Sequence, residues 1–91
     1  IINTHPSLLP KYGGKGMHGM HVHQAVIDAH EKYSGVTVHF INSEYDKGDI
    51  IRQTRVDVLP EDTAETLSRK VQAVEKIQLV QVINDFINNK I

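Results

Sequence analysis

INTHPSLLPKYGGKG, residues 2–16, carries an apolar strand end straight into a loop rich in Pro and Gly. Residues 1–4 are predicted to form the strand, because the chain enters on two adjacent Ile residues. The segment that follows is predicted to be a loop, since the backbone angles of Pro are fixed and those of Gly are unusually free. A chain that enters directly on a buried strand indicates that other strands precede it. We therefore expect a fragment of a larger parallel sheet.

The rest of the chain shows the periodicities of a helix, two strands and a second helix. Residues 19–32 have apolar positions at helical spacing, whereas residues 35–42 and 50–58 alternate apolar with polar side chains. The short turn between the two strands favours antiparallel pairing. A long C-terminal helix is predicted after Asp62, which fits a capping box with Glu65. Its apolar residues recur at intervals of three and four, and we expect them all to face the sheet: Leu67, Val71, Val74, Ile77, Val80, Ile83, Phe86 and Ile87.

Composition predicts one soluble α/β domain over residues 1–91 and excludes several classes of function. The chain has 10 Lys and Arg, 11 Asp and Glu, a formal net charge of −1 and no Cys. The balanced charge argues against a nucleic-acid partner, and no apolar run is long enough for a membrane span. The lack of Cys excludes a disulfide, a thiolate nucleophile and a zinc-thiolate site, and it fits a cytoplasmic protein.

The first strand offers a pair of groups suited to acyl chemistry. Asn3 and His5 are two residues apart, so in a strand they project from the same face, at the carboxyl end where open α/β sheets bind ligands. An amide can donate to a developing oxyanion, and an imidazole can exchange a proton near neutral pH. A third group is expected to orient the imidazole. Asp46 and Asp49 both suit this role, and Asp46 is preferred because Gly48 lets its turn fold back.

Two longer motifs extend this interpretation. Residues 3–10 read Asn-x-His-Pro-Ser-Leu-Leu-Pro, and residues 35–51 read GVTVHFINSEYDKGDII. Both resemble the signature motifs of the folate-dependent formyltransferases, in the same order, and the resemblance extends through essentially the whole chain. It implies a Rossmann-like formyltransferase sheet of which this chain is the carboxyl-terminal, catalytic portion. In that family the preceding half supplies the loop that holds the nucleotide phosphate, and no such loop is found in this sequence.

The resemblance also implies a reaction. A formyl group would pass from 10-formyltetrahydrofolate, a cosubstrate, to the amine of glycinamide ribonucleotide in de novo purine biosynthesis, without a metal. Asn3 and His5 would stabilise the tetrahedral species, and Asp46 would hold His5 and favour its charged form. Glu75 would contact the glycinamide end of the acceptor together with His5. The folate would be bound by Asn3 and by the loop Asn42, Ser43, Glu44, Tyr45 and Asp46.

Other functions remain open at this point. A formyltetrahydrofolate hydrolase would use a similar Asn, His and Asp, but its relatives tend to read His-His-Ser-Phe where this chain has His-Pro-Ser-Leu from His5 onward. An enzyme that formylates initiator tRNA would usually have Gly at the position of Pro6 and a further basic domain. The alternative of another class is an inactive fragment that self-associates through its exposed sheet edge, which would make a homo-oligomer.

The remaining polar residues have less specific interpretations. His18, His21 and His23 do not share one helix face, so exposed helix and loop positions are preferred over a metal site. His39 is expected to be a hydrogen-bonded residue near the site and not a proton carrier. Three lysines surround the proposed site and would either meet an anionic ligand or face solvent: Lys11, Lys15 and Lys47.

Overall fold

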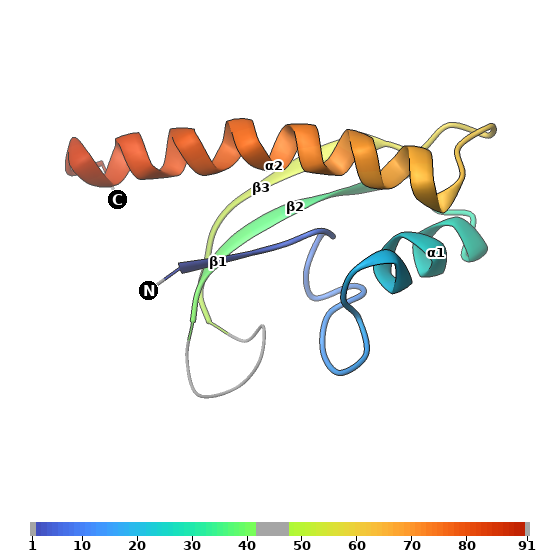
Figure 1. Cartoon of the computed structure of the whole chain (residues 1–91). Coiled ribbons are helices and arrows are strands. Elements are labelled where there is room, and N and C mark those ends of the chain that lie inside the picture. The colour runs from blue at the N-terminus through green and yellow to red at the C-terminus, as the bar shows by residue number, and fades with distance from the viewer. Residues whose placement is uncertain (1, 42–47, 91) are drawn as a thin grey trace.

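The computed structural model describes residues 2–41 and 48–90 (Figure 1). Its elements follow in the order β1 (Ile2–His5), α1 (Met20–Asp28), β2 (Tyr33–Phe40), β3 (Ile50–Asp57) and α2 (Ala64–Ile87). The strands form one sheet in the order β1-β2-β3, and β2 pairs antiparallel with both neighbours. The α/β class, the antiparallel pair and the long C-terminal helix are confirmed. Among the described residues all strand pairs are antiparallel, so the expected parallel pairs are not found in this part of the chain.

Strand β2 is the centre of the sheet and is buried on both faces. Val36 and Val38 are fully buried on one face, and Thr37 and His39 are at most 1% exposed on the other. The strand starts two residues before the predicted position, because Tyr33 and the residue after it continue the ladder with β3. The β-branched residues Val36, Thr37 and Val38 suit this pleated, enclosed position.

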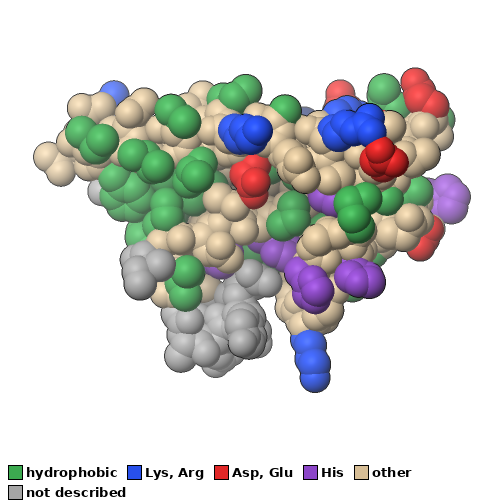
Figure 2. Space-filling view, in the orientation of Figure 1, with side chains coloured by type: hydrophobic (Ala, Val, Ile, Leu, Met, Phe, Trp, Pro, Cys, Tyr) green, Lys and Arg blue, Asp and Glu red, His purple; other side chains and the backbone are tan. Residues whose placement is uncertain are grey.

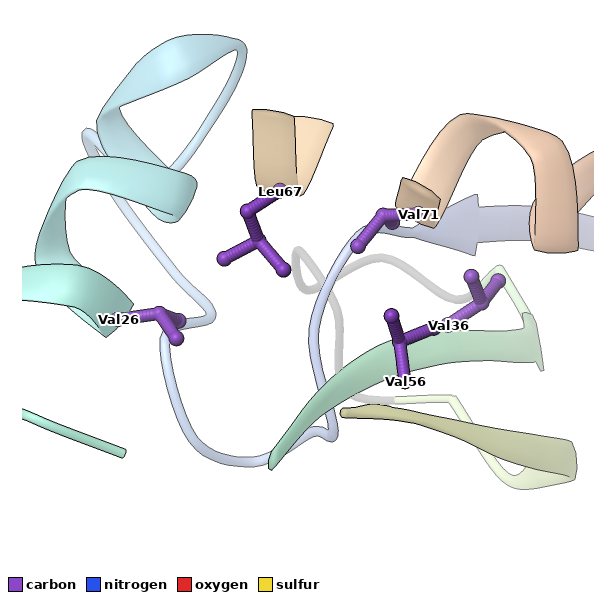
Figure 3. Packing of buried hydrophobic residues seen from close by; sticks show 5 residues of the cluster. All are labelled: Val26, Val36, Val56, Leu67 and Val71. Atoms are coloured by element: carbon purple, nitrogen blue, oxygen red, sulfur yellow. The ribbon is translucent and has the colours of Figure 1, made fainter. Parts of the chain in front are cut away.

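Both helices pack on the face of the sheet that carries the valines (Figure 3). Val26 of α1 meets Leu67 and Val71 of α2 over Val36 and Val56 of the strands. All five side chains are 7% exposed or less. Fully burying a side chain of this kind contributes roughly 1.5–3 kcal/mol. This cluster is therefore the main apolar core of the described chain.

The segment after β1 covers the opposite face of the sheet. The hydroxyl of Thr37 donates to the carbonyl of Ser7 at 2.7 Å and accepts from the backbone N–H of Leu9 at 3.1 Å. Gln53 of β3 adds its amide, which donates to the carbonyl of Leu9 at 2.9 Å. Gly35 permits this close approach, because a Cβ there would lie 2.5 Å from Leu8 and 2.3 Å from a β3 carbonyl. The turn that follows Asn3 and His5 is thus anchored to the sheet.

The ends of both helices differ from the prediction. The cap of α2 is Thr63, whose side chain accepts from the N–H of Thr66 while the Thr66 hydroxyl accepts from the N–H of Thr63. Asp62 precedes this capping box instead of forming it, so the Asp62–Glu65 assignment is wrong. Helix α1 ends at Asp28 and not near residue 32, because His30 adopts a φ of 56° that a helix cannot continue.

The predicted apolar stripe of α2 does not all face the sheet. Leu67, Val71 and Val82 are fully buried, but Ile77 is 61% exposed. At about 100° per residue, repeated steps of three turn away from the buried face, so the four exposed large apolar residues of α2 lie about 120° to 180° from Val71. The inward position is taken by Gln78, whose amide donates to a carbonyl of β2 at 3.4 Å and to one of β3 at 3.2 Å. Figure 2 shows apolar side chains along the exposed surface of α2. The exposed large apolar residues of this helix are Ile77, Val80, Ile83 and Ile87.

Candidate active site

Asn3 and His5 lie side by side at the end of β1. In the ladder they pair with His39 and Thr37 of β2, so both project from the face opposite the valine core. They line a pocket of about 760 Å³, which also takes in Thr4 and the segment from Gly14 to Gly19. Asn3 and His5 thus share one strand face, as expected, while their roles at a site remain predictions.

His5 is held in a defined orientation. Its side chain is only 5% exposed, and Nε2 lies 2.7 Å from the backbone carbonyl of Tyr12. A carbonyl oxygen can only accept, so Nε2 carries a hydrogen in this arrangement. Tyr12 is itself fixed, since its hydroxyl donates to Glu31 at 2.8 Å and its φ is 56°. The ring of His5 is thus aligned by the carbonyl of Tyr12, whose side chain is anchored to Glu31, just after the end of α1.

The loop between β1 and α1, traced in Figure 1, contributes residues Gly14 to Gly19 to the lining of the pocket. Gly14 and Gly16 both have a φ of 84°, a conformation that favours glycine, and no atom lies within 4 Å of a Cβ built on either. Lys15 and His18 also line the pocket, whereas its described lining residues include no Asp or Glu. A pocket with this charge balance favours an anionic ligand.

The three lysines of the prediction have different outcomes. Lys15 lies in the pocket wall. Lys11 instead forms an ion pair with Glu31 at 3.3 Å, beside a different cavity that is lined by Tyr12 and Ser34. Lys47 lies outside the described residues. A role in binding an anionic ligand therefore remains a prediction for Lys15 and has no geometric support for Lys11.

Glu75 reaches β1 from α2. Its side chain is half-buried, and the hydroxyl of Thr4 donates to its Oε2 at 2.6 Å. Thr4 stands between Asn3 and His5 and also lines the pocket. Sequence reasoning missed Thr4, although a polar residue on the helix-facing side of this strand was a visible signal.

The expectation that His23 of α1 is exposed is wrong. Its side chain is 3% exposed, and its Nδ1 has no hydrogen-bond partner among residues 2–41 and 48–90. Burial lowers the pKa of His23, the negative charge of Glu75 opposes this effect, and His5 lowers the pKa further. His23 therefore lies within electrostatic reach of both Glu75 and His5, which belong to two other elements.

Five of the predicted site residues lie outside the described part of the chain: Asn42, Ser43, Glu44, Tyr45 and Asp46. The structure does define where their segment leaves and rejoins the sheet. The N–H of Phe40 donates to the carbonyl of Asp49 at 2.9 Å, and Gly48 packs directly on the backbone of Phe40. The neighbouring residue His39 pairs with Asn3 across the ladder and is 1% exposed. The two ends of the segment therefore lie next to the strand position opposite Asn3.

Several His side chains gather on one surface of the molecule (Figure 2). The rings of His18 and His21 meet edge to face at 5.6 Å, while His23 is buried. Within residues 2–41 and 48–90, no group of three or more His, Cys, Asp or Glu side chains could hold a metal ion. Nor does the described part contain a helix with the length and apolarity needed to span a membrane.

Comparison with known proteins decides the family. The sequence model of the Formyl transferase family matches residues 1–83. The chain belongs to the Formyl transferase family. A chloroplastic phosphoribosylglycinamide formyltransferase of Arabidopsis thaliana is 44% identical over 91 residues, which are 100% of this chain and 31% of the plant protein.

Solved formyl transferase structures agree with the sequence relatives. Phosphoribosylglycinamide formyltransferase from Anaplasma phagocytophilum matches with a TM-score of 0.87 and 36% identity, over 98% of this chain and 41% of that one. A formyltetrahydrofolate deformylase from Pseudomonas syringae matches with a TM-score of 0.84 and 30% identity, over 97% and 28% of the two chains. The chain thus spans about a third of the length of the first relatives it matches.

Proposed function

We propose that this chain is the catalytic part of an enzyme that transfers a formyl group from 10-formyltetrahydrofolate to the amine of glycinamide ribonucleotide, a step of purine biosynthesis. The observation that carries the proposal is the pairing of Asn3 and His5 in one pocket of a chain similar over its whole length to phosphoribosylglycinamide formyltransferase. The acceptor is a phosphate ester, which suits a pocket with Lys15 in its wall.

In the proposed reaction, the amine nitrogen of the acceptor attacks the formyl carbon and a tetrahedral species forms. Asn3 donates its amide N–H to the developing oxyanion, and His5 assists both the oxyanion and the transfer of a proton. As the bond from the formyl carbon to N10 of the folate breaks, the proton lost by the amine reaches that nitrogen. The transfer needs neither a metal nor a covalent enzyme intermediate.

Asp46 has the role of orienting His5 and favouring its charged form. The segment that contains Asp46, residues 42–46, also binds the folate through its backbone. Asn3 binds the folate together with this segment. Support comes from the anchored ends of this segment next to His39, the strand partner of Asn3. Asp46→Asn keeps the shape and removes the charge, so we expect kcat to fall about a hundredfold, within the usual range for loss of general acid-base assistance. Asp57→Asn, at the other end of β3, is the control that leaves kcat unchanged.

The proposal includes an amino-terminal part that precedes this chain and completes the phosphate site. The relatives are about three times as long as the region they share with this chain, which supports the idea. We expect the 91 residues alone to be inactive. The outer edge of β1 has no partner strand in the described chain and would receive either this part or a second copy. Light scattering during size-exclusion chromatography distinguishes a monomer from a homo-oligomer.

A cytoplasmic location belongs to the same proposal. The chain has no Cys, so nothing in it depends on an oxidising compartment. The Arabidopsis relative is named chloroplastic, which makes an organelle the alternative. Cell fractionation with an antibody against the chain separates the two locations.

The deciding experiment measures two products from one reaction mixture. The full product of the gene is incubated with 10-formyltetrahydrofolate and glycinamide ribonucleotide, and both formylated acceptor and free formate are quantified. We expect the wild-type enzyme to produce formylated acceptor, and we expect the rate of this transfer to be at least a hundredfold lower in His5→Ala. His30→Asn is the matched control, because His30 is exposed, lies outside the pocket and has a φ of 56° that Asn tolerates. Formate without formylated acceptor would assign the hydrolase activity that the deformylase neighbour represents.

A further inference from the structure

A single hydroxyl connects the long helix to the strand that carries Asn3 and His5. Thr4 of β1 donates to Oε2 of Glu75 at 2.6 Å, across 71 positions of sequence. Because successive strand residues point to opposite faces, Thr4 faces α2 while its two neighbours face the other side. The pocket nevertheless includes Thr4, since β1 is the edge strand of the described sheet. Thr4 therefore contacts both the pocket and Glu75 of α2.

The hydrogen bond from Thr4 uses only one of the two carboxylate oxygens of Glu75. Thr4 occupies Oε2, and Oε1 has no hydrogen bond to another residue among those described. Glu75 is half-buried, so its charge is only partly screened by solvent. The hydrogen bond from Thr4 places this carboxylate next to the end of β1 that carries His5.

We propose that Thr4 is the positioning residue that holds Glu75 beside the pocket, on the α2 side of β1, and thereby sets the affinity for the amine-bearing acceptor. This inference rests on the proposed function, in which Oε1 of Glu75 receives the ammonium of glycinamide ribonucleotide before it loses its proton. The hydroxyl restricts the rotation of a flexible side chain and keeps one oxygen directed to the acceptor. A Val at this position has the same shape but no donor, so the carboxylate would lose its orientation.

The test is steady-state kinetics of the full gene product with each substrate varied in turn. In Thr4→Val we expect the KM for glycinamide ribonucleotide to rise about tenfold, the size typical of one hydrogen bond to a charged group. The KM for 10-formyltetrahydrofolate stays unchanged, and Thr4→Ser, which keeps the hydroxyl, restores the wild-type value. Thr54→Val is the matched control, because Thr54 also donates from the sheet to an α2 side chain, Gln78, but lies outside the pocket.

A double-mutant cycle separates positioning from general structure. If Thr4 acts through Glu75, adding Thr4→Val to Glu75→Gln raises the acceptor KM no further. An unchanged acceptor KM in Thr4→Val, or equal increases for both substrates, would overturn the inference while the proposed function stands. Wild-type protein that neither formylates glycinamide ribonucleotide nor binds it in calorimetry would overturn the function and the inference together.

Discussion

Among the described residues, the carboxyl group of Asp62 has the most strongly lowered pKa. Replacing Asp62 is therefore a direct test of how α2 is anchored. The ammonium of Lys70 donates to its Oδ2 at 2.6 Å, and the backbone N–H of Leu59 and the hydroxyl of Thr66 donate at 2.9 and 2.7 Å. These groups, Lys70 first, lower the pKa of Asp62 from 3.8 to about 2. The carboxylate thus joins the turn after β3 to the first two turns of the helix.

The size of the effect follows from linkage between protonation and folding. A pKa lowered from 3.8 to about 2 corresponds to at most about 2.5 kcal/mol, since each pKa unit is worth about 1.4 kcal/mol. The Lys70 side chain is 34% exposed, so screening by solvent reduces this value, and we expect about 1–2 kcal/mol. Because the folded pKa is depressed, this stability is fully present above pH 3.8 and is lost as the pH falls toward about 2.

The assay is urea unfolding followed by far-UV circular dichroism. Asp62→Asn should lower the free energy of unfolding by about 1–2 kcal/mol at neutral pH, and the difference from wild type should shrink below pH 3.8. Glu65→Gln is the control, because Glu65 pairs with Arg69 on the surface, where both side chains are 70% exposed. We expect less than about 0.5 kcal/mol there. Equal effects of the two variants, or a difference that persists near pH 2, would refute the reasoning.

Three further predictions concern the sheet and its surroundings. Gly48→Ala should abolish formyl transfer and lower Tm, because its Cβ would lie 1.5 Å from the carbonyl oxygen of Phe40; activity and Tm near wild type would contradict the packing. Burial keeps His23 neutral by lowering its pKa, so the folded state binds fewer protons than the unfolded one and stability should fall as the pH drops below 6.5. His23→Gln should reduce this fall in a series of Tm measurements, and an unchanged pH profile would exclude His23 as its source. Gln78→Ala should cost about 2–4 kcal/mol in urea unfolding, since it opens a cavity and leaves the Thr54 hydroxyl unpaired, whereas exposed Ile77→Ala should cost less than about 1 kcal/mol.

Prediction succeeded where short-range pattern decides structure. Alternation and periodicity within a few residues predict strands β2 and β3 and helix α2. The common strand face of Asn3 and His5 follows from the same alternation. It failed at the helix ends, where Thr63 with Thr66 competed with an equally plausible Asp62–Glu65 pair. Such boundaries depend on which of several polar side chains the incoming turn brings near the free N–H groups.

The position of the long apolar stripe shows the limit of periodicity. Spacings of three and four are each compatible with one face, but only packing selects the set that touches the sheet. Gln78 is buried there because it satisfies two strand carbonyls, and Ile77 beside it is left in solvent. A hydrophobicity pattern ranks these two residues in the opposite order.

By itself, the sequence determined the α/β class, the order of elements and the presence of Asn3 and His5 on one strand face, since these depend on neighbours in the chain. Only the tertiary structure decided which distant groups meet them. The contact of Thr4 with Glu75 joins residues 71 positions apart, and Lys11 is drawn away from the pocket by Glu31, 20 positions on. Contacts at such separations are set by how the helices dock on the sheet, and no local pattern encodes that docking.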